Sequence, residues 1–350
     1  MNRSIFIKPD TDNFKLTGRY FTGSDILWLV QSGSAIEFKL TASKASVTVK
    51  GDNSDGYYKE QMPRYAVIVN GKTVFDSVTD RKDVTADIIN SDEEKTVTVK
   101  IIHLSEANSG AVGITGFDIV SSSETPVRPV PLKKYSIEFI GDSITCAYGV
   151  ESENELEMFT TLTENFMKSY AYLAAEKLDA DYSAVSYSGF GVISAYSATG
   201  IKDTSRLVPD NYLLAGNQPE CRKPWDFSGR KHDAVLVYLG TNDTNYVGND
   251  KDRMNEFTEG YLNFLGTVRE KNPDAFILCT IGTMQHGNIY PAIENAVSRF
   301  RNEKDERISC FHLPSQKEAD GFGSDWHPSA VTQRKCAELV VAELEKVLGH

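Results

Sequence analysis

The sequence predicts a two-domain protein in which an all-β domain precedes a three-layer α/β/α domain with a mostly parallel sheet. Three observations predict this fold class: short alternating strands in residues 1–122, a stretch rich in proline at residues 123–134, and strands that alternate with helices in residues 135–350. A length of 350 residues is enough for two domains that each bury a core.

The amino-terminal part reads as an antiparallel β-sandwich or jelly roll. Apolar and polar residues alternate in four clear runs, at residues 35–40, 46–50, 65–69 and 96–102. Turn formers such as Asn70 followed by Gly71 separate the runs, and no convincing helical stretch lies among them. Short strands at this spacing are typical of antiparallel sandwiches and jelly rolls.

The stretch after these strands reads as a linker. Residues 121–134 are rich in serine and contain three prolines, so neither a helix nor a central strand is expected to run through them. We therefore place the boundary between the domains at residues 123–134.

The carboxyl-terminal part reads as a parallel α/β sheet. Apolar runs predict strands at 137–140, 182–187, 234–239, 276–281 and 308–312, and helical periodicity predicts helices at 163–178, 252–270, 291–301 and 329–347. Alternating elements of these lengths indicate a three-layer fold with a mostly parallel sheet. Ligands of such sheets gather at the carboxyl ends of the strands, so polar residues there are candidates for function.

Composition and charge exclude some classes of partner. A formal net charge of −12 argues against a nucleic-acid footprint and against attraction to an anionic membrane. Five cysteines without a CxxC pair indicate reduced, mostly buried thiols. The first ten residues lack the apolar core of a signal peptide, so we expect a cytoplasmic protein, although a secreted chain trimmed of its signal would read the same.

Four polar clusters follow the predicted strands. Ser143 follows the first strand, residues 188–191 the second and residues 239–243 the third, while residues 323–329 precede the last helix. Taken singly, each cluster reads as a turn, and Ser329 reads as a helix cap. Taken together they supply the parts that acyl transfer requires.

Each part of an acyl-transfer site has a candidate. Ser143 offers a hydroxyl nucleophile and His327 an imidazole base. The backbone amides of Ser143 and Gly189, with the side-chain amide of Asn242, can converge on one oxyanion if the three strands are neighbours. Glycine at position 189 lets a backbone donor approach the substrate closely.

Other chemistries have weaker support. Gly189, Gly191 and Ser194 nearly match a dinucleotide fingerprint, but the third position is serine. Neither an HExxH motif nor a cysteine–histidine cluster indicates a metal site. A GxSxG motif is absent around Ser143, because position 145 is threonine, which disfavours an α/β-hydrolase.

The segments "GDSIT", "SGFG", "GTND" and "DWHP" resemble, in order, the four sequence blocks of the SGNH (GDSL-type) hydrolases. The preceding β domain, with the weaker motifs at residues 163–171 and 224–226, is similar to carbohydrate esterase family 2, whose members are two-domain acetyl-xylan esterases. The resemblance implies Ser143 as nucleophile, His327 as base, and Gly189 and Asn242 in the oxyanion hole, with no cofactor.

One position departs from the family pattern. The usual block has an aspartate three residues before the histidine, where this chain has Ser324, and the nearby acid is Asp325. Two arrangements stay open: Asp325 reaches His327 and completes a triad, or a backbone carbonyl orients the imidazole and leaves a dyad. Trp326 stands between Asp325 and His327, where its indole can stack on a sugar ring. Trp225, by contrast, is expected in the core.

We therefore expect a serine esterase that removes acetyl groups from acetylated xylan or xylo-oligosaccharides through an acetyl-enzyme. Two alternatives stay open: a GDSL-type lipase or thioesterase with a long acyl channel, and a non-catalytic carbohydrate-binding protein on a hydrolase scaffold. The expected partner is an acetylated saccharide, without nucleic acid or membrane. The sequence leaves the oligomeric state open, with a homo-oligomer among the possibilities.

Overall fold

The computed structural model describes residues 2–10, 12–52, 59–80, 82–229, 231–284 and 287–349, so positions 1 and 350, the outer ends of the two expected domains, lie outside the described residues. The chain forms two compact units. The first unit holds Met1–Leu132 with two later segments, Thr160–Glu164 and Ala215–Lys223. The second unit holds Lys133–Phe159, Asn165–Leu214 and Pro224–His350.

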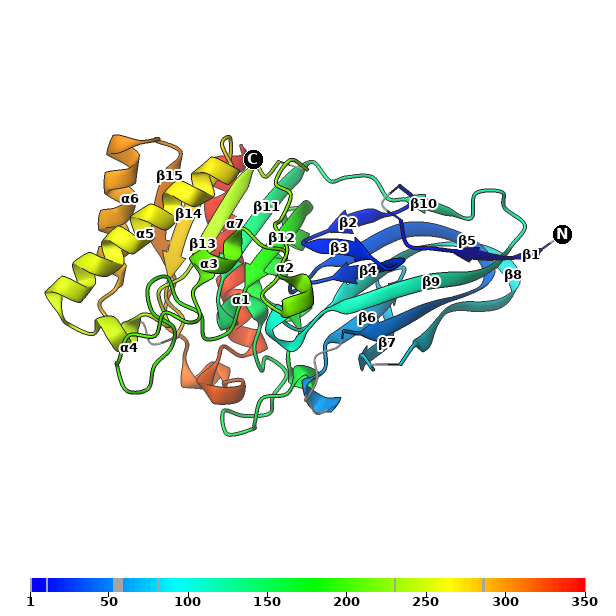
Figure 1. Cartoon of the computed structure of the whole chain (residues 1–350), viewed down its shortest axis with the longest axis horizontal. Coiled ribbons are helices and arrows are strands. Elements are labelled where there is room, and N and C mark those ends of the chain that lie inside the picture. Colours follow the sequence, from blue (N-terminus) through cyan, green and yellow to red (C-terminus); the bar gives the residue numbers. More distant parts are fainter. Residues whose placement is uncertain are drawn as a thin grey trace. The chain divides into compact units, whose positions relative to one another are not determined.

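The first unit is an antiparallel β domain (Figure 1). Its central path runs in the order β3-β4-β9-β5-β8-β6-β7, while β1 pairs with β9, and β2 and β10 pair with β5. The strands are β1 (Arg3–Ile7), β2 (Lys15–Thr17), β3 (Tyr20–Gly23), β4 (Ile26–Leu29), β5 (Ala35–Gly51), β6 (Arg64–Val69), β7 (Lys72–Val78), β8 (Val84–His103), β9 (Val112–Ser121) and β10 (Val127–Pro129).

The long strand β5 joins two strands that the sequence predicts separately, at residues 35–40 and 46–50. Its register with β8 shifts between Ala42 and Lys44 and again between Ala45 and Ser46. Side chains alternate between the two faces of a strand, and a bulge inserts an extra residue that shifts this alternation by one position. The inward residues accordingly change from even to odd positions: Ile36, Phe38, Leu40 and Ala42, then Ala45, Val47 and Val49.

The stretch expected to be a linker contains the short strand β10, which pairs antiparallel with β5. Val127 is buried in the core of the first unit. Proline lacks an N–H group, which restricts it to strand ends and edges, and Pro129 stands at the end of β10. The prolines therefore allow a short edge strand here.

The second unit is built on a sheet of five parallel strands in the order β12-β11-β13-β14-β15. The strands are β11 (Tyr135–Gly141), β12 (Ala180–Ser186), β13 (Ala234–Tyr238), β14 (Phe276–Ile281) and β15 (Ile308–His312). The helices are α1 (Ser143–Cys146), α2 (Tyr170–Lys177), α3 (Val208–Tyr212), α4 (Thr244–Val247), α5 (Lys251–Lys271), α6 (Tyr290–Glu303) and α7 (Ala330–Leu348).

The direction of the crossovers decides which face of the sheet each helix covers. The chain moves one way from β11 to β12 through α2, and the opposite way from β13 through α5 to β14 and through α6 to β15. Since crossovers are right-handed, α2 lies on one face and α5 and α6 on the other. The last helix, α7, packs with α2, and Figure 1 shows it on the far side of the strands from α5.

The predicted helix at residues 163–178 is shorter in the structure. A 3₁₀ turn at Phe166–Lys168 comes first, and α2 begins at Tyr170. Asn165 and Ser169 both have extended backbones, and their side chains accept hydrogen bonds from Met167 N and Tyr172 N. These two caps interrupt the helical pattern. In the described part of the chain, no helix is long and apolar enough to span a bilayer.

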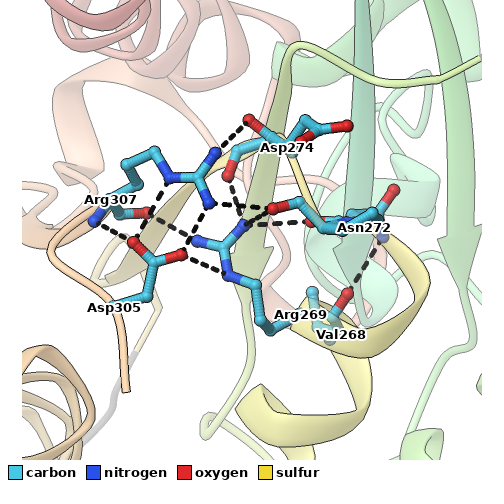
Figure 2. A network of polar contacts seen from close by, with 8 residues as sticks. Val268, Arg269, Asn272, Asp274, Asp305 and Arg307 are labelled. Carbon is cyan, nitrogen blue, oxygen red and sulfur yellow. Dashed lines mark hydrogen bonds and ion pairs between the residues drawn. The ribbon is translucent and has the colours of Figure 1, made fainter. Parts of the chain in front are cut away.

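A polar network joins α5 to the amino-terminal ends of β14 and β15 (Figure 2). Arg269 donates to the carbonyl oxygens of Asn272 at 3.0 Å and Arg307 at 2.9 Å, and its Nε lies 3.2 Å from Asp305. Arg307 also pairs with Asp305, at 2.9 Å. The network therefore fixes the edge of the sheet opposite to the carboxyl ends of the strands.

Candidate active site

Ser143 lies just after the end of β11, an inner strand between β12 and β13. Asp142 caps α1, and its carboxylate accepts from Ile144 N at 3.0 Å. A Cβ at Gly141 would lie 2.0 Å from Thr145 Oγ1, so only glycine allows this close turn. The Ser143 side chain is held beneath the surface, with 7% of the residue exposed. Its amide is the first of α1 and so has no acceptor within the helix.

Gly189 and Asn242 lie on either side of Ser143, because β12 and β13 both pair with β11. Gly189 has a φ of 80°, a left-handed backbone that favours glycine. The Asn242 amide donates to Phe190 O at 2.8 Å and, at a longer 3.3 Å, to Asp142 Oδ2. The sequence analysis expected Ser143, Gly189 and Asn242 to converge if the strands before them are neighbours. The three strands β12, β11 and β13 are neighbours in the sheet.

His327 contacts Ser143 directly. Its Nε2 lies 2.8 Å from Ser143 Oγ, and its Nδ1 lies 2.9 Å from the carbonyl oxygen of Ser324. A carbonyl oxygen only accepts hydrogen bonds, so the hydrogen of the neutral ring sits on Nδ1. Nε2 is then the acceptor for the Ser143 hydroxyl, which is the tautomer that a general base requires.

The His327 ring is neutral at physiological pH. Burial lowers the pKa of the imidazole to about 4, while the hydrogen bond to Ser324 and the charge of Asp325 act to raise it. Loss of water contacts disfavours the charged ring more strongly than these two groups stabilise it. The base is therefore in its proton-accepting form well below pH 7.

The Asp325 carboxylate has a different partner from the one a triad requires. It is exposed and accepts a hydrogen bond from the phenol of Tyr148 at 2.9 Å, while Ser324 O occupies Nδ1 of His327. Trp326 is 53% exposed and packs against Phe322 with ring centroids 5.1 Å apart. Trp225, expected in the core, is half-buried.

Asp243 is a residue of the site that the sequence analysis did not single out. Its fully buried carboxylate accepts from the backbone amides of Val192, Ile193 and Ser194 at 2.8–3.1 Å. It thereby fixes the loop that begins at Gly189. Burial raises the pKa of Asp243 to about 6, against the lowering effect of these amides. The sequence signal that could have identified Asp243 is its position as the acid at the end of the "GTND" segment.

Metal ligands do not gather at this edge. Within the described ranges, no group of three histidine, cysteine, aspartate or glutamate residues is arranged to hold an ion. Ser143 is instead accompanied by the His327 imidazole, the Asn242 amide and the Asp142 carboxylate, which accepts from Ile144 N and Asn242. The amide donor suits stabilisation of an anion that develops on an acyl carbonyl.

A parallel sheet with serine, glycine, asparagine and histidine at its carboxyl edge defines a class of hydrolase. The chain belongs to the GDSL-like lipase/acylhydrolase family, whose model matches residues 137–340. A second family model, carbohydrate esterase 2 N-terminal, matches residues 16–129. The two-domain organisation is thus that of the family 2 carbohydrate esterases, as the sequence predicted.

Named relatives agree with this assignment. The chain is 31% identical to the cellulase/esterase CelE of Acetivibrio thermocellus over 97% of its length, but it spans only 40% of that relative. It is 27% identical to an acetylxylan esterase/glucomannan deacetylase of Cellvibrio japonicus, covering 72% of this chain and 69% of the relative. A family two carbohydrate esterase from Clostridium thermocellum, solved in complex with cellohexaose, superposes with a TM-score of 0.83 at 28% identity, covering 96% of this chain and 99% of that one.

Proposed function

We propose that this protein is a serine esterase that removes O-acetyl groups from acetylated xylan or xylo-oligosaccharides. The observation that carries the proposal is the 2.8 Å contact between Ser143 Oγ and His327 Nε2. Gly189 and Asn242 lie beside this pair at the same edge of the sheet. The acetylated sugar is suggested by relatives whose names include acetylxylan esterase.

The geometry supports a two-step acyl transfer. His327 Nε2 accepts the Ser143 proton as Oγ attacks the ester carbonyl carbon. The resulting oxyanion accepts from the amides of Ser143 and Gly189, and from Asn242 once its Nδ2 releases the longer, 3.3 Å bond to Asp142. The imidazolium then returns its proton to the departing sugar oxygen, which leaves an acetyl group on Ser143. Water, activated by the same imidazole, attacks this ester and releases acetate.

The second candidate is a GDSL-type lipase or thioesterase with broader acyl specificity. The family model that matches the α/β part includes lipases by its description. The two candidates differ in the length of acyl group that the site accepts. Acyl-chain length is therefore the property to measure.

The test is acetate release from acetylated xylo-oligosaccharides, beside turnover of an aryl acetate and an aryl octanoate, by the wild type and by Ser143→Ala. We expect turnover of both acetates, negligible turnover of octanoate, and a loss of at least about a thousandfold in the variant. Octanoate turnover at a comparable rate would move the assignment to lipases. Acetate release that persists in Ser143→Ala would overturn the proposed nucleophile.

We also propose a cytoplasmic location, as expected from the sequence. None of the five cysteines forms a disulfide bond, which suits a reducing compartment. Fractionation of cells that make the protein from its natural gene tests this proposal. Activity that is recovered mainly outside the cell would contradict it.

A further inference from the structure

Tyr148 packs directly on the catalytic imidazole. Its ring lies between two other rings of the second unit, with centroids 4.3 Å from His327 and 3.9 Å from Phe159. The Phe159 ring is nearly parallel to Tyr148, at 10°. Tyr148 follows Ala147, which ends α1 in a left-handed conformation. The short segment that carries Ser143 therefore also supplies an aromatic wall for His327.

The phenol of Tyr148 also contacts the turn that precedes His327. It donates to Asp325 Oδ2 at 2.9 Å. Asp325 and Trp326 have φ angles of 52° and 62°, so two consecutive residues other than glycine adopt the left-handed region. Such a conformation is unfavourable for most side chains and persists where its surroundings hold it.

Backbone contacts hold the same turn. Asp325 N donates to Glu155 O at 3.0 Å, and Gln316 donates to Trp326 O at 2.8 Å. His327 N donates to Ser324 O at 3.0 Å, and this same carbonyl oxygen faces His327 Nδ1. The position of the carbonyl that orients the imidazole thus depends on the left-handed pair.

We propose that Tyr148 and Asp325 act together as a clamp that positions His327. The ring of Tyr148 supports one face of the imidazole, and its hydrogen bond to Asp325 fixes the turn that brings Ser324 O to Nδ1. Asp325 is then a positioning residue, which acts through Tyr148 rather than on the imidazole. This inference rests on the proposed function, because it explains how that site keeps its base in place.

The clamp and a catalytic triad predict different results for one substitution. Asparagine keeps a carbonyl oxygen that accepts from Tyr148, and it tolerates the left-handed region well. A clamp therefore predicts that Asp325→Asn keeps kcat within about threefold of the wild type. A triad aspartate replaced by asparagine instead loses on the order of ten-thousandfold in kcat.

Removal of either partner of the hydrogen bond should have the same effect. Asp325→Ala and Tyr148→Phe each remove it, and we expect kcat to fall about tenfold to a hundredfold, as for loss of a hydrogen bond to a charged group. KM for the acetylated sugar should stay within about twofold, because neither group is assigned to sugar binding. The double variant should be no slower than the slower single variant, since both lose one interaction.

Tyr246→Phe is the matched control. Tyr246 also donates from its phenol to a carboxylate, Glu256, at 2.7 Å, but its ring lies against Lys202 and Arg253. We expect its kcat to equal that of the wild type. Unfolding temperatures of all variants are measured alongside, and Asp325→Asn serves as the rescue that separates positioning from a loss of folding.

A second readout keeps the clamp separate from the proposed substrate. The rate at which an aryl phosphonate inactivates Ser143 depends on the Ser143–His327 geometry and not on the sugar. We expect this rate to fall in Asp325→Ala and Tyr148→Phe and to stay near the wild type in Asp325→Asn. That pattern supports the clamp even if no acetylated sugar is turned over. A thousandfold loss in Asp325→Asn, or an unchanged rate in Tyr148→Phe, would overturn it.

Discussion

At the scale of single residues, the site depends on buried polar groups that hold backbone rather than touch substrate. Asp243 is the clearest case, because it accepts three consecutive amides of the loop after Gly189. Each of these amides is shielded from water, so each needs an acceptor within the protein. The carboxylate thus sets where the Gly189 amide stands relative to Ser143.

We expect Asp243→Ala to lower both stability and turnover. Three buried amides lose their acceptor, and an unsatisfied donor costs about 1–3 kcal/mol, so the free energy of unfolding should fall by at least about 3 kcal/mol. Displacement of the Gly189 donor should lower kcat by about a hundredfold or more. Urea unfolding and acetate release measure the two effects. Asp243→Asn keeps one acceptor oxygen, so its stability and kcat should lie between those of the wild type and Asp243→Ala. Equal values for all three proteins would contradict this role.

The pH dependence of kcat/KM follows from the burial of His327. The proposed mechanism requires the neutral ring, and burial lowers the pKa of the imidazole to about 4 from the ordinary 6.5. Activity should therefore rise with pH through about 4 and be on its plateau at pH 6.5, where an unperturbed histidine is half protonated. A profile measured between pH 3 and 8 on an aryl acetate checks this. An acidic limb centred near pH 6.5 would contradict it.

Trp326 permits a test of its proposed contact with sugar. More than half of it is exposed beside the base, so a ring can stack on it at little cost. We expect Trp326→Ala to raise KM for acetylated xylo-oligosaccharides about tenfold, with a change of less than twofold for an aryl acetate. Equal changes for both substrates would leave Trp326 a packing role only.

At the scale of elements, the network of Figure 2 stabilises the edge of the sheet remote from Ser143. Arg269 is largely buried, with 14% of its side chain exposed, and it donates to carbonyl groups that precede β14 and β15. Arg299, by contrast, pairs with Glu259 on an exposed helix surface. The two arginines therefore allow the contributions of a buried network and an exposed ion pair to the free energy of unfolding to be compared in one protein.

We expect Arg269→Ala to lower the free energy of unfolding by about 2–4 kcal/mol, because several carbonyl oxygens and Asp305 lose their donor together. Arg299→Ala should cost no more than about 1 kcal/mol, as is usual for an exposed ion pair. Urea unfolding of both variants measures the difference. Similar losses in the two would show that the network is no more than a surface feature.

Element by element, the sequence was most informative where periodicity alone decides structure. The strands at residues 276–281 and 308–312 match β14 and β15 to the residue. The helix at 163–178 was too long, because capping by Asn165 and Ser169 is a local competitor that periodicity does not register. The two strands within β5 were not joined, since a bulge leaves no alternation to follow.

The candidate site also has residues that the sequence indicated and a contact that it did not. Ser143, Gly189, Asn242 and His327 stand at strand ends or before a helix, and their residue types together with these places in the chain indicated them. The partner of Asp325 did not follow from the sequence. Tyr148 and Asp325 are 177 positions apart, and no spacing rule connects residues brought together by tertiary packing.

At the scale of the whole molecule, the first unit is completed by segments that come later in the chain. Arg64 donates to Leu162 O at 2.7 Å, Glu106 N donates to the buried Glu164 carboxylate at 2.9 Å, and Gln31 donates to Ala215 O at 3.0 Å. The boundary between the units is therefore not a single cut in the sequence.

We expect residues 133–350, produced alone, to be less stable than the full chain. The segments Thr160–Glu164 and Ala215–Lys223 would lose the residues that bury them, and Glu164 would be exposed to water. Urea unfolding followed by tryptophan fluorescence, with Trp225 and Trp326 as probes, should give a lower midpoint. A midpoint equal to that of the full chain would contradict this expectation.

The distance along the chain between the two side chains proposed to react has a consequence for synthesis. Ser143 and His327 are 184 positions apart, and only Pro328 and Ser329 separate His327 from α7. Because a chain leaves the ribosome from its amino terminus, the strand that ends before Ser143 can emerge and fold long before His327 is added. If the proposed roles are right, a nascent chain is therefore chemically silent until His327 has been translated and folded, and ester turnover reports only on molecules whose synthesis has passed this histidine.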